Sequence, residues 1–109
     1  NYSSVVTLAK QFLDLHYTED VNLTLISEMV GVSEGYLSKQ FTKEVGCNFI
    51  QYLTNLRIEE SKRLMKKKGN KITDIAETVG YLNVEHFSRM FKKTTGYSPK
   101  LYRESLMNG

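Results

Sequence analysis

The sequence is poor in residue types that would indicate disulfides or a membrane span. Its 109 residues include one cysteine, one proline and no tryptophan. A single cysteine, Cys47, excludes an intrachain disulfide and provides no pair with zinc-binding spacing. No run approaches the ~20 apolar residues that a membrane-spanning helix needs, and no secretory leader pattern opens the chain. We therefore expect a protein of the reducing cytoplasm that makes no membrane contact.

Motifs for catalysis and metal binding are also absent. The sequence has no G-x-S-x-G, no phosphate-binding P-loop and no H-E-x-x-H. His16 and His86 lie far apart in sequence, and Glu59-Glu60 with Arg63 nearby is typical of surface charge on a helix. We expect no enzymatic activity, no metal and no cofactor.

Apolar residues recur at spacings of three and four throughout, and no stretch alternates as a strand would, so the pattern predicts an all-α fold of seven helices. Helix N-caps are expected at Ser3 or Ser4, Ser33, Asn48, Thr73, Asn83 and Ser98, and a further short helix is expected to begin at Asn22-Leu23-Thr24. The first helix is expected to bury Val5, Leu8, Ala9, Phe12 and Leu13. The long middle helix is expected to run from 48 to 68 and to bury Phe49, Tyr52, Leu53, Leu56, Leu64 and Met65.

One amphipathic segment occurs twice, as GYLSKQFTKEVG at 35–46 and EHFSRMFKKTTG at 85–96. Each copy follows a short helical segment and a glycine, which is the layout of a helix-turn-helix. The middle helix joins the two groups. The sequence thus predicts two helix-turn-helix subdomains joined by a long linker helix, with boundaries at 1–47, 48–68 and 69–109.

The repeated helices present basic and hydroxyl side chains on their outer faces. At 100° per residue, Leu37 and Phe41 define the buried side of the first copy. The outward residues are Gly35, Tyr36, Lys39, Thr42 and Lys43 in the first copy and Glu85, His86, Arg89, Lys92 and Lys93 in the second, with Ser38 and Ser88 on the flanks. Arg or Lys pairs with guanine, and Glu accepts from cytosine. For one copy alone a plain solvated face is as good an interpretation, but the pair favours DNA.

A linker of ~20 residues is roughly 30 Å long at 1.5 Å per residue, close to the ~34 Å between successive major-groove faces of B-DNA. The two outer faces differ, so the expected site is asymmetric double-stranded DNA of about two helical turns. A helical protein-interaction module is the main alternative. RNA suits the layout less well, because the major groove of A-form RNA excludes a helix.

Two longer stretches carry a family resemblance. ITDIAETVGYLNVEHFSRMFKKTTGYSPKLYR at 72–103 and LSKQFTKEVGCNFIQYLTNLRI at 37–58 resemble the DNA-binding domain of the AraC/XylS family of bacterial transcription regulators. The resemblance implies two helix-turn-helix subdomains bridged by a long helix, with the third and sixth helices reading DNA. It also implies burial of Ile75, Ala76, Gly80, Phe87, Phe91 and Pro99. Two positions depart from the family pattern: Gly35, where a larger contacting side chain is common, and Ser61, where Ala is usual.

The resemblance also assigns the base contacts by position, while the phosphate contacts follow from the outward polar and basic residues. Base contacts are expected from Glu34, Gly35, Ser38, Lys39, Val84, Glu85, Ser88 and Arg89. The predicted phosphate contacts are Ser33, Tyr36, Thr42, Lys43, Asn83, His86, Lys92 and Lys93. RNA polymerase is a further candidate partner, through acidic pairs such as Glu19-Asp20 or Glu59-Glu60. The chain is expected to be the C-terminal part of a longer bacterial regulator, monomeric in isolation, with dimerisation through a sensor or receiver domain that this sequence lacks.

Overall fold

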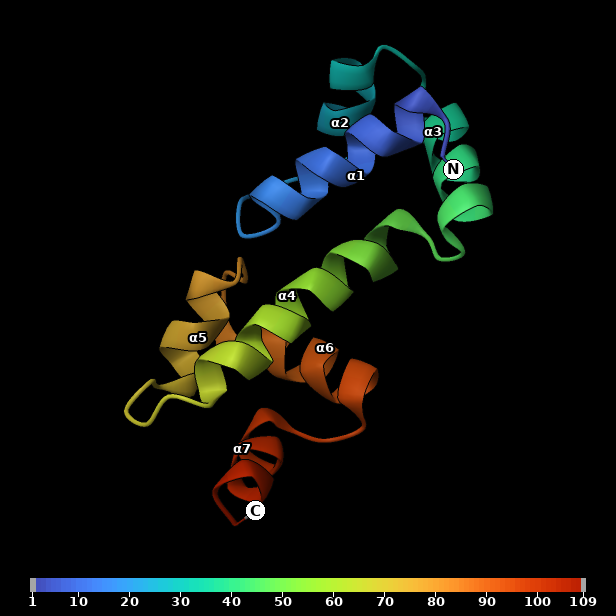
Figure 1. The fold of residues 1–109 in the computed structure, drawn as a ribbon. Helices are drawn as coiled ribbons and strands as arrows, with labels where there is room; N and C mark the ends of the chain where they lie inside the picture. The colour runs from blue at the N-terminus through green and yellow to red at the C-terminus, as the bar shows by residue number, and fades with distance from the viewer. Residues whose placement is uncertain (1, 109) are drawn as a thin grey trace. The chain divides into compact units, whose positions relative to one another are not determined.

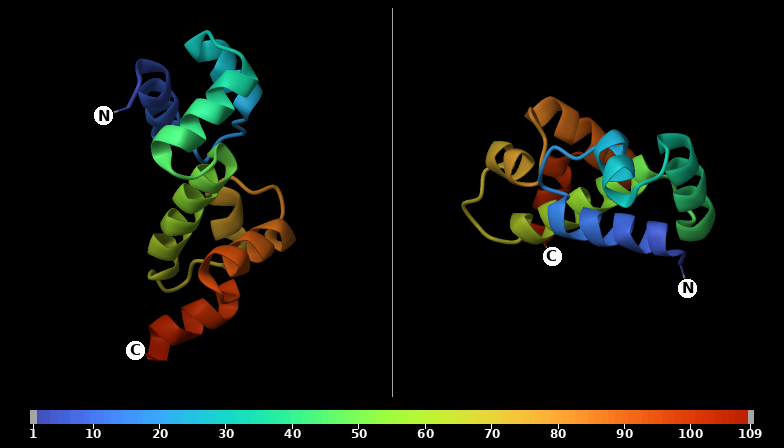
Figure 2. Two further views of the ribbon diagram at one scale, coloured as in Figure 1. Left: turned by 90° about the vertical axis from the view of Figure 1, so that its right-hand side faces the viewer. Right: turned by 90° about the horizontal axis from the view of Figure 1, so that it is seen from above.

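The computed structural model describes residues 2–108, which form seven α-helices and no β-strand (Figures 1 and 2). The predicted all-α fold with seven helices is confirmed. Within these residues no helix combines the length and apolar character needed to cross a membrane. The helices are α1 (Ser4–His16), α2 (Leu23–Val30), α3 (Glu34–Val45), α4 (Phe49–Met65), α5 (Ile72–Thr78), α6 (Val84–Thr95) and α7 (Pro99–Asn108).

Most of the predicted N-caps are confirmed by hydrogen bonds. In six helices a side-chain oxygen accepts from the backbone N–H three residues further on, at 2.8–3.4 Å: at the predicted caps Ser3, Ser33, Asn48, Asn83 and Ser98, and also at Asn22. The prediction for Thr73 is wrong. Helix α5 begins at Ile72, so Thr73 already lies inside it, and the N-cap is Lys71, which makes no side-chain capping bond.

Helices α3 and α6 end alike. Gly46 and Gly96 follow them with φ of 93° and 87°, and their N–H groups donate to Thr42 O and Lys92 O at 3.0 and 2.7 Å. This left-handed conformation is one that glycine adopts without the steric cost of a Cβ atom. The two repeated segments therefore share both their start and their stop signals.

The helices pack into two compact units, 1–54 and 55–109, divided inside α4. In the first unit α1, α2 and α3 pack against one another with the start of α4. Phe41 of α3 meets the rings of Phe49 and Tyr52 edge-on, at centroid distances of 6.3 and 5.5 Å. Fully buried members of this core are Val6, Ala9, Leu13, Ile26, Leu37 and Phe41.

The second unit has its own core, built from the later part of α4 with α5, α6 and α7. Phe91 of α6 meets the ring of Tyr102 of α7 edge-on at 5.3 Å, as Phe41 meets Tyr52 in the first unit. The core contains Ile58, Met65, Ile75, Ala76, Val79, Tyr81, Phe87 and Phe91. Of the positions that the family resemblance placed inside, Ile75, Ala76, Phe87, Phe91 and Pro99 are buried, and Gly80 is half-buried.

Helix α4 differs from its prediction in two ways. It ends at Met65 rather than Lys68, because Lys66 N and Lys67 N bond back three residues to Arg63 O and Leu64 O, both at 3.3 Å, and this tighter turn stops the α-helix. Asn70 Nδ2 also donates to Leu64 O at 2.9 Å.

The buried residues of α4 also differ from the predicted set. The structure buries Phe49, Leu53 and Met65 as expected and leaves Tyr52, Leu56 and Leu64 half-buried. It also buries Thr54, Ile58 and Ser61, which were not predicted. A single apolar stripe was the wrong model, because the two halves of α4 contribute to different cores. Ser61 is fully buried and donates to Ile58 O at 2.6 Å, so its hydroxyl is satisfied within the helix.

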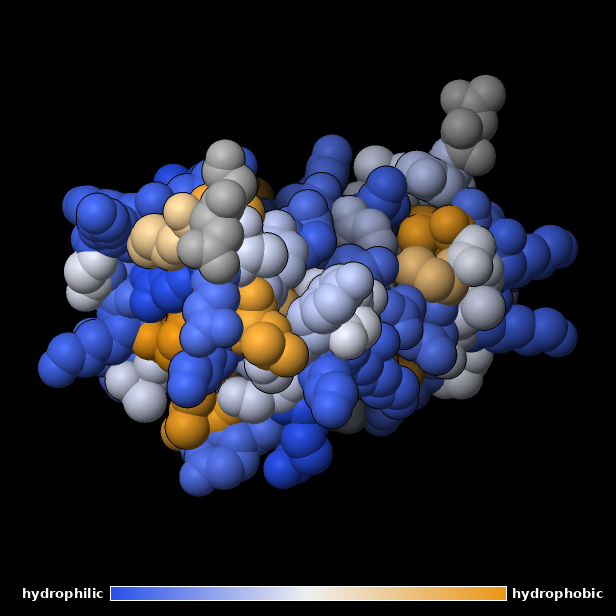
Figure 3. Space-filling view, turned by 90° about the horizontal axis from the view of Figure 1, so that it is seen from below, coloured by the Kyte–Doolittle hydropathy of each residue, from blue (hydrophilic) through white to orange (hydrophobic). Residues whose placement is uncertain are grey.

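Helix α1 buries only part of the face that was expected. Ala9 and Leu13 are fully buried as expected, and Val6 is added to them. Val5 and Phe12 are half-buried, and Leu8 is 52% exposed. Elsewhere, on the face seen from below, hydrophobic side chains form small patches surrounded by hydrophilic ones (Figure 3).

Candidate nucleic-acid interface

The α2–turn–α3 motif presents one face of α3 to solvent. Leu37 and Phe41 anchor the opposite face with no exposed surface. Ser33 fixes the start of the helix, because its Oγ accepts from Tyr36 N at 3.1 Å. The hydroxyl hydrogen of Ser33 remains available as a donor to a phosphate oxygen.

The predicted contacts of α3 lie on this solvent face. Tyr36 is 53% exposed despite its size. Ser38 is half-buried on the flank, as its position relative to Leu37 predicts. The exposed members of the set are Ser33, Glu34, Gly35, Tyr36, Lys39, Thr42 and Lys43.

Glu44 is turned away from this face. Its two carboxylate oxygens accept from Ser3 N at 2.5 Å and from Gln40 Nε2 at 2.9 Å. The backbone N–H of Ser3 is the main reason that the pKa of Glu44 is lowered. The carboxylate is therefore engaged with the start of α1, and the neighbouring Lys43 also contributes to its lowered pKa.

Gly35 leaves space on the surface of α3. A Cβ atom built on it would meet no atom within 4 Å, and its backbone is helical. The first turn of α3 therefore exposes backbone at the position where α6 carries the side chain of Glu85. A nucleic acid can approach this part of α3 closely.

The α5–turn–α6 motif repeats the arrangement with more positive charge. Phe87 and Phe91 are fully buried, and Asn83 Oδ1 accepts from His86 N at 2.8 Å. The amide nitrogen of Asn83 remains a donor at the helix N-terminus. The exposed members of the predicted set are Asn83, Glu85, His86, Arg89, Lys92 and Lys93, while Val84 and Ser88 are half-buried.

Two of these residues, Val84 and His86, also pack against buried residues of the second unit. The ring of His86 meets Tyr81 edge-on, at a centroid distance of 5.1 Å. Val84 packs against the core of the second unit. These contacts hold the first turn of α6 in place, while His86 remains exposed and Val84 half-buried.

The cations of α3 and α6 are not neutralised by ion pairs. In residues 2–108 the salt bridges join His16 to Glu19, Lys62 to Glu59 and Arg63 to Glu60, and none involves α3 or α6. Lys62 and Arg63 of α4 are thus paired, whereas no salt bridge engages Lys39, Arg89, Lys92 or Lys93. This contrast favours a polyanion at α3 and α6.

One exposed residue beside α6 has no assigned role in the sequence predictions. Leu82, in the turn just before the cap Asn83, is 102% exposed. The corresponding turn of the first motif is one residue shorter, and that difference was the available sequence signal. A projecting apolar group at this position can contact the methyl group of a thymine.

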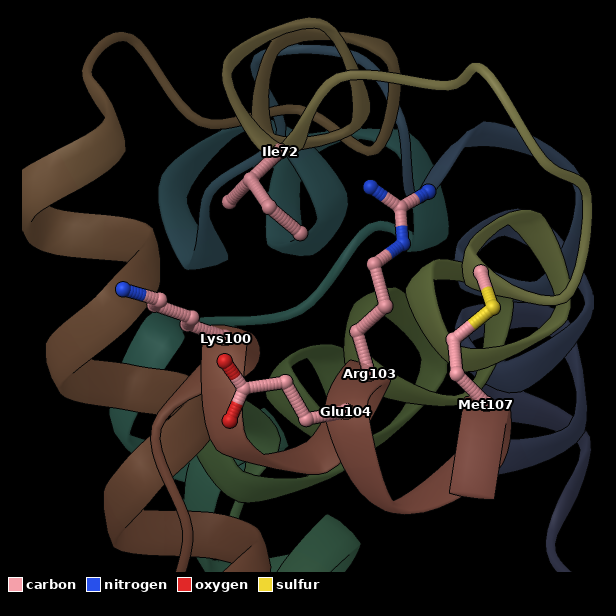
Figure 4. Close-up of a pocket in the computed structure, with 5 residues that line it drawn as sticks. All are labelled: Ile72, Lys100, Arg103, Glu104 and Met107. Atoms are coloured by element: carbon pink, nitrogen blue, oxygen red, sulfur yellow. The ribbon is translucent and has the colours of Figure 1, made fainter. Parts of the chain in front are cut away.

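A separate hollow lies between the start of α5 and helix α7. Ile72, Lys100, Arg103, Glu104 and Met107 line it (Figure 4). Arg103 belongs to the framework, since its Nε and Nη2 atoms lie 3.5 Å from Met65 O and Lys67 O at the end of α4. None of the predicted DNA contacts lines this hollow, so it is not part of the candidate interface.

A model of the family described as "Helix-turn-helix domain" matches residues 26–105, most of the chain and both motifs. The chain is an AraC-type helix-turn-helix domain. This is a family of transcription-regulator DNA-binding domains and not of enzymes.

Individual relatives agree with the family. An uncharacterized HTH-type transcriptional regulator of Staphylococcus aureus strain COL is 41% identical over 92 residues, which cover 84% of this chain and 12% of that protein. The chain therefore spans about an eighth of the length of this curated relative. The C-terminal domain of AraT, a response regulator from Geobacillus stearothermophilus, superposes with a TM-score of 0.92 at 37% identity, covering 96% of this chain and 88% of that domain.

A more distant structure shares the fold of this AraC-type domain. The DNA-binding domain of the global transcriptional factor AdpA superposes with a TM-score of 0.86 at 18% identity, covering 94% of this chain and 93% of that one. That structure contains a target DNA.

Proposed function

We propose that this AraC-type domain binds double-stranded DNA sequence-specifically through α3 and α6, and that it regulates bacterial transcription. The observation that carries the proposal is the pair of capped helices, each anchored by two buried side chains and each presenting cations without ion-pair partners. The same fold holds a target DNA in AdpA.

Each helix has groups suited to base edges. On α3 these are Glu34, Ser38 and Lys39, together with the bare backbone at Gly35. On α6 they are Val84, Glu85, Ser88 and Arg89, and we add the neighbouring Leu82. Arg89 is the strongest reader, because its guanidinium can pair with both O6 and N7 of a guanine.

Phosphate contacts set the register and most of the salt dependence. The proposed set is Ser33, Tyr36, Thr42, Lys43, Asn83, His86, Lys92 and Lys93, all of which are exposed. Lys92 and Lys93 in the last turn of α6 are expected to contribute most, since they add full charges that have no ion-pair partner.

We further propose that the two helices enter adjacent major-groove segments of one asymmetric site of about two turns. Residues 1–47 and 69–109 then act as the two readers and 48–68 as the spacer. The readers differ at corresponding positions, Gly35 against Glu85 and Lys39 against Arg89, so a symmetric operator is not expected. In a bacterial cell, RNA polymerase is a candidate second partner.

Selection of bound duplexes from a random pool tests the proposal. The expected result at moderate ionic strength is one enriched asymmetric sequence of about two turns. An absence of enrichment refutes sequence-specific binding. A palindromic site that requires two molecules refutes the proposed use of both helices by one chain.

Substitution then tests the assigned helices. Arg89→Ala should cost about 1–3 kcal/mol on the selected site and relax preference at one base position. Lys92→Ala should weaken all duplexes about equally and reduce the salt slope by about one unit. Lys10→Ala is the matched control, because it removes the same charge from α1, where Lys10 Nζ lies 4.4 Å from the ring centroid of Tyr2. An Arg89→Ala effect no larger than that of Lys10→Ala would contradict the assignment.

A further inference from the structure

The first unit has an apolar groove on the side formed by α1 and α2. Its walls include Leu8, Leu15 and Met29, which are 52%, 78% and 57% exposed. Phe12 and His16 also line it, and their rings are stacked at a centroid distance of 4.5 Å. Leu25, further along the surface of α2, is 38% exposed. These apolar side chains are not used by the proposed DNA interface.

The second unit shows what the same architecture needs at these positions. The later half of α4 corresponds to α1 when 52 is added to each residue number: Val6, Ala9 and Leu13 fall on Ile58, Ser61 and Met65, and all six have no exposed surface. Lys10 Nζ lies 5.6 Å from the ring centroid of Tyr52, and Lys62 Nζ lies 5.8 Å from that of Tyr102. Helix α5 corresponds to α2 when 49 is added, so that Ile26 falls on Ile75, both buried.

The exposed apolar side chains beside the groove have no apolar counterparts in the second unit, although the lining residues Phe12, Ile26 and Val30 fall on Leu64, Ile75 and Val79. By these correspondences, Leu8, Leu25 and Met29 are replaced by Glu60, Asp74 and Thr78, and Leu15 by Lys67, which lies just past the end of α4. Glu60 there accepts from Arg63, which corresponds to Gln11, at 2.6 and 2.7 Å. The fold is therefore built equally well with a charged surface in this place, so packing within the unit does not explain the apolar one.

The charge around the groove excludes nucleic acid as its occupant. Residues 15–30, which run from the lining part of α1 to the end of α2, contain the exposed acidic residues Glu19, Asp20 and Glu28 and no lysine or arginine. At one end of the groove, Glu19 Oε2 lies 2.6 Å from Nδ1 of the lining residue His16. A phosphate backbone would be repelled here, whereas a cationic partner would be attracted.

We propose that the groove between α1 and α2 binds a basic amphipathic helix of a partner protein. Such a helix places apolar anchors at i, i+3 or i+4 and i+7 in a hydrophobic groove, and its Lys or Arg residues would face the acidic segment. A second copy of this chain is disfavoured, because a two-fold contact would set the same acidic segment against itself. A standard interface also buries about 800 Å² on each partner, which is more than these few side chains supply. The groove is therefore better suited to a small helical ligand of moderate affinity.

A peptide selection tests the proposal without knowledge of the natural partner. The probe is a phage-displayed library of 18-residue helical peptides, presented to the full 109-residue chain. The expected winners combine three apolar residues on one face with a net positive charge. Synthetic winners should perturb the NMR signals of Leu8, Leu15 and Met29. No enrichment, or winners that are acidic, would overturn the proposal.

The second unit supplies the matched variant. Leu8→Glu, Leu15→Lys and Met29→Thr together install the residues found at the corresponding positions, and the two new charges cancel. We expect this triple variant to keep its melting temperature and its affinity for the selected DNA, and to lose peptide affinity at least tenfold. Leu101→Lys, at a residue of α7 that is 56% exposed, is the control and should keep the peptide affinity. Retention of peptide binding by the triple variant overturns the groove assignment. Loss of DNA binding by a folded triple variant also overturns it, by placing the groove on the DNA surface, but leaves the proposed function standing.

Discussion

Two glycines of the first unit should respond to the same substitution with opposite sign. Gly35 lies in the first turn of α3 with helical backbone, whereas Gly46 follows the helix with φ of 93°. A Cβ atom on either residue would meet no atom within 4 Å. Neither substitution is therefore expected to cause a steric clash, and the two sites differ in their backbone conformation.

The magnitudes follow from that difference. Gly35→Ala reduces the freedom of the unfolded chain at a compatible site and should stabilise by about 0.5 kcal/mol. Gly46→Ala places a Cβ atom in the left-handed region and should cost about 1–2 kcal/mol. Urea unfolding followed by circular dichroism at 222 nm measures both changes. In melting temperature they correspond to roughly 2 °C upward and 4–8 °C downward.

Gly69, with φ of 94°, provides a control in the other unit, and Gly69→Ala should also destabilise. The reasoning would be refuted if Gly35→Ala and Gly46→Ala shifted stability in the same direction, since both sites are equally open. A second readout concerns DNA. Gly35→Arg should raise affinity for the selected duplex if α3 faces it.

Three further predictions concern single side chains. Replacing the thymine that Leu82 contacts by uracil should weaken DNA binding by the unaltered protein by about 0.8 kcal/mol, the value of one apolar carbon. The same replacement should not weaken DNA binding by Leu82→Ala. Equal losses for the two proteins in filter binding would exclude a methyl contact. Tyr52→Phe removes the bond from Oη to Asp14 Oδ1 at 2.7 Å and should cost about 1 kcal/mol in urea unfolding; burial raises the pKa of Tyr52, so this donor stays neutral. Arg63 lowers the pKa of Glu60 below its usual 4.5, so the stability from this pair is present above pH 4.5 and is lost as the pH falls through the lowered pKa. The free energy of unfolding of Glu60→Gln should therefore fall less between pH 6 and pH 3 than that of the unaltered protein. The same pH dependence in both proteins would count against the pair.

The elements that sequence predicted well are those decided within one helical turn. Ser33 and Asn83 are caps because their oxygens reach an N–H three residues away, and this requires no knowledge of the rest of the fold. The outward faces of α3 and α6 followed from helical spacing around Phe41 and Phe91, so the proposed DNA contacts are exposed or lie on the flank as expected.

The predictions that failed depended on distant partners. Leu8 is as apolar as Leu13, and only the packing of α2 and α3 decides that Leu13 is buried and Leu8 is not. Ile58 and Ser61 were missed on α4 because a single stripe was assumed where two cores share one helix. Leu82 lies in a turn and outside the helical spacing of apolar residues, so the pattern did not single it out. Its exposure accompanies one extra residue in that turn.

The division of the chain inside α4 has a practical consequence for fragments. Lys66, Lys67 and Lys68 are exposed and follow the last residue of the helix, so they are a natural point of attack for trypsin. A cut there leaves residues 1–54 with all the helices of their own core, but it separates α5, α6 and α7 from Ile58, Ser61 and Met65. Limited digestion should thus release an N-terminal piece that stays folded and a C-terminal piece that is degraded further, although the longer of the two stretches that resemble the family, 72–103, lies in the piece that is lost.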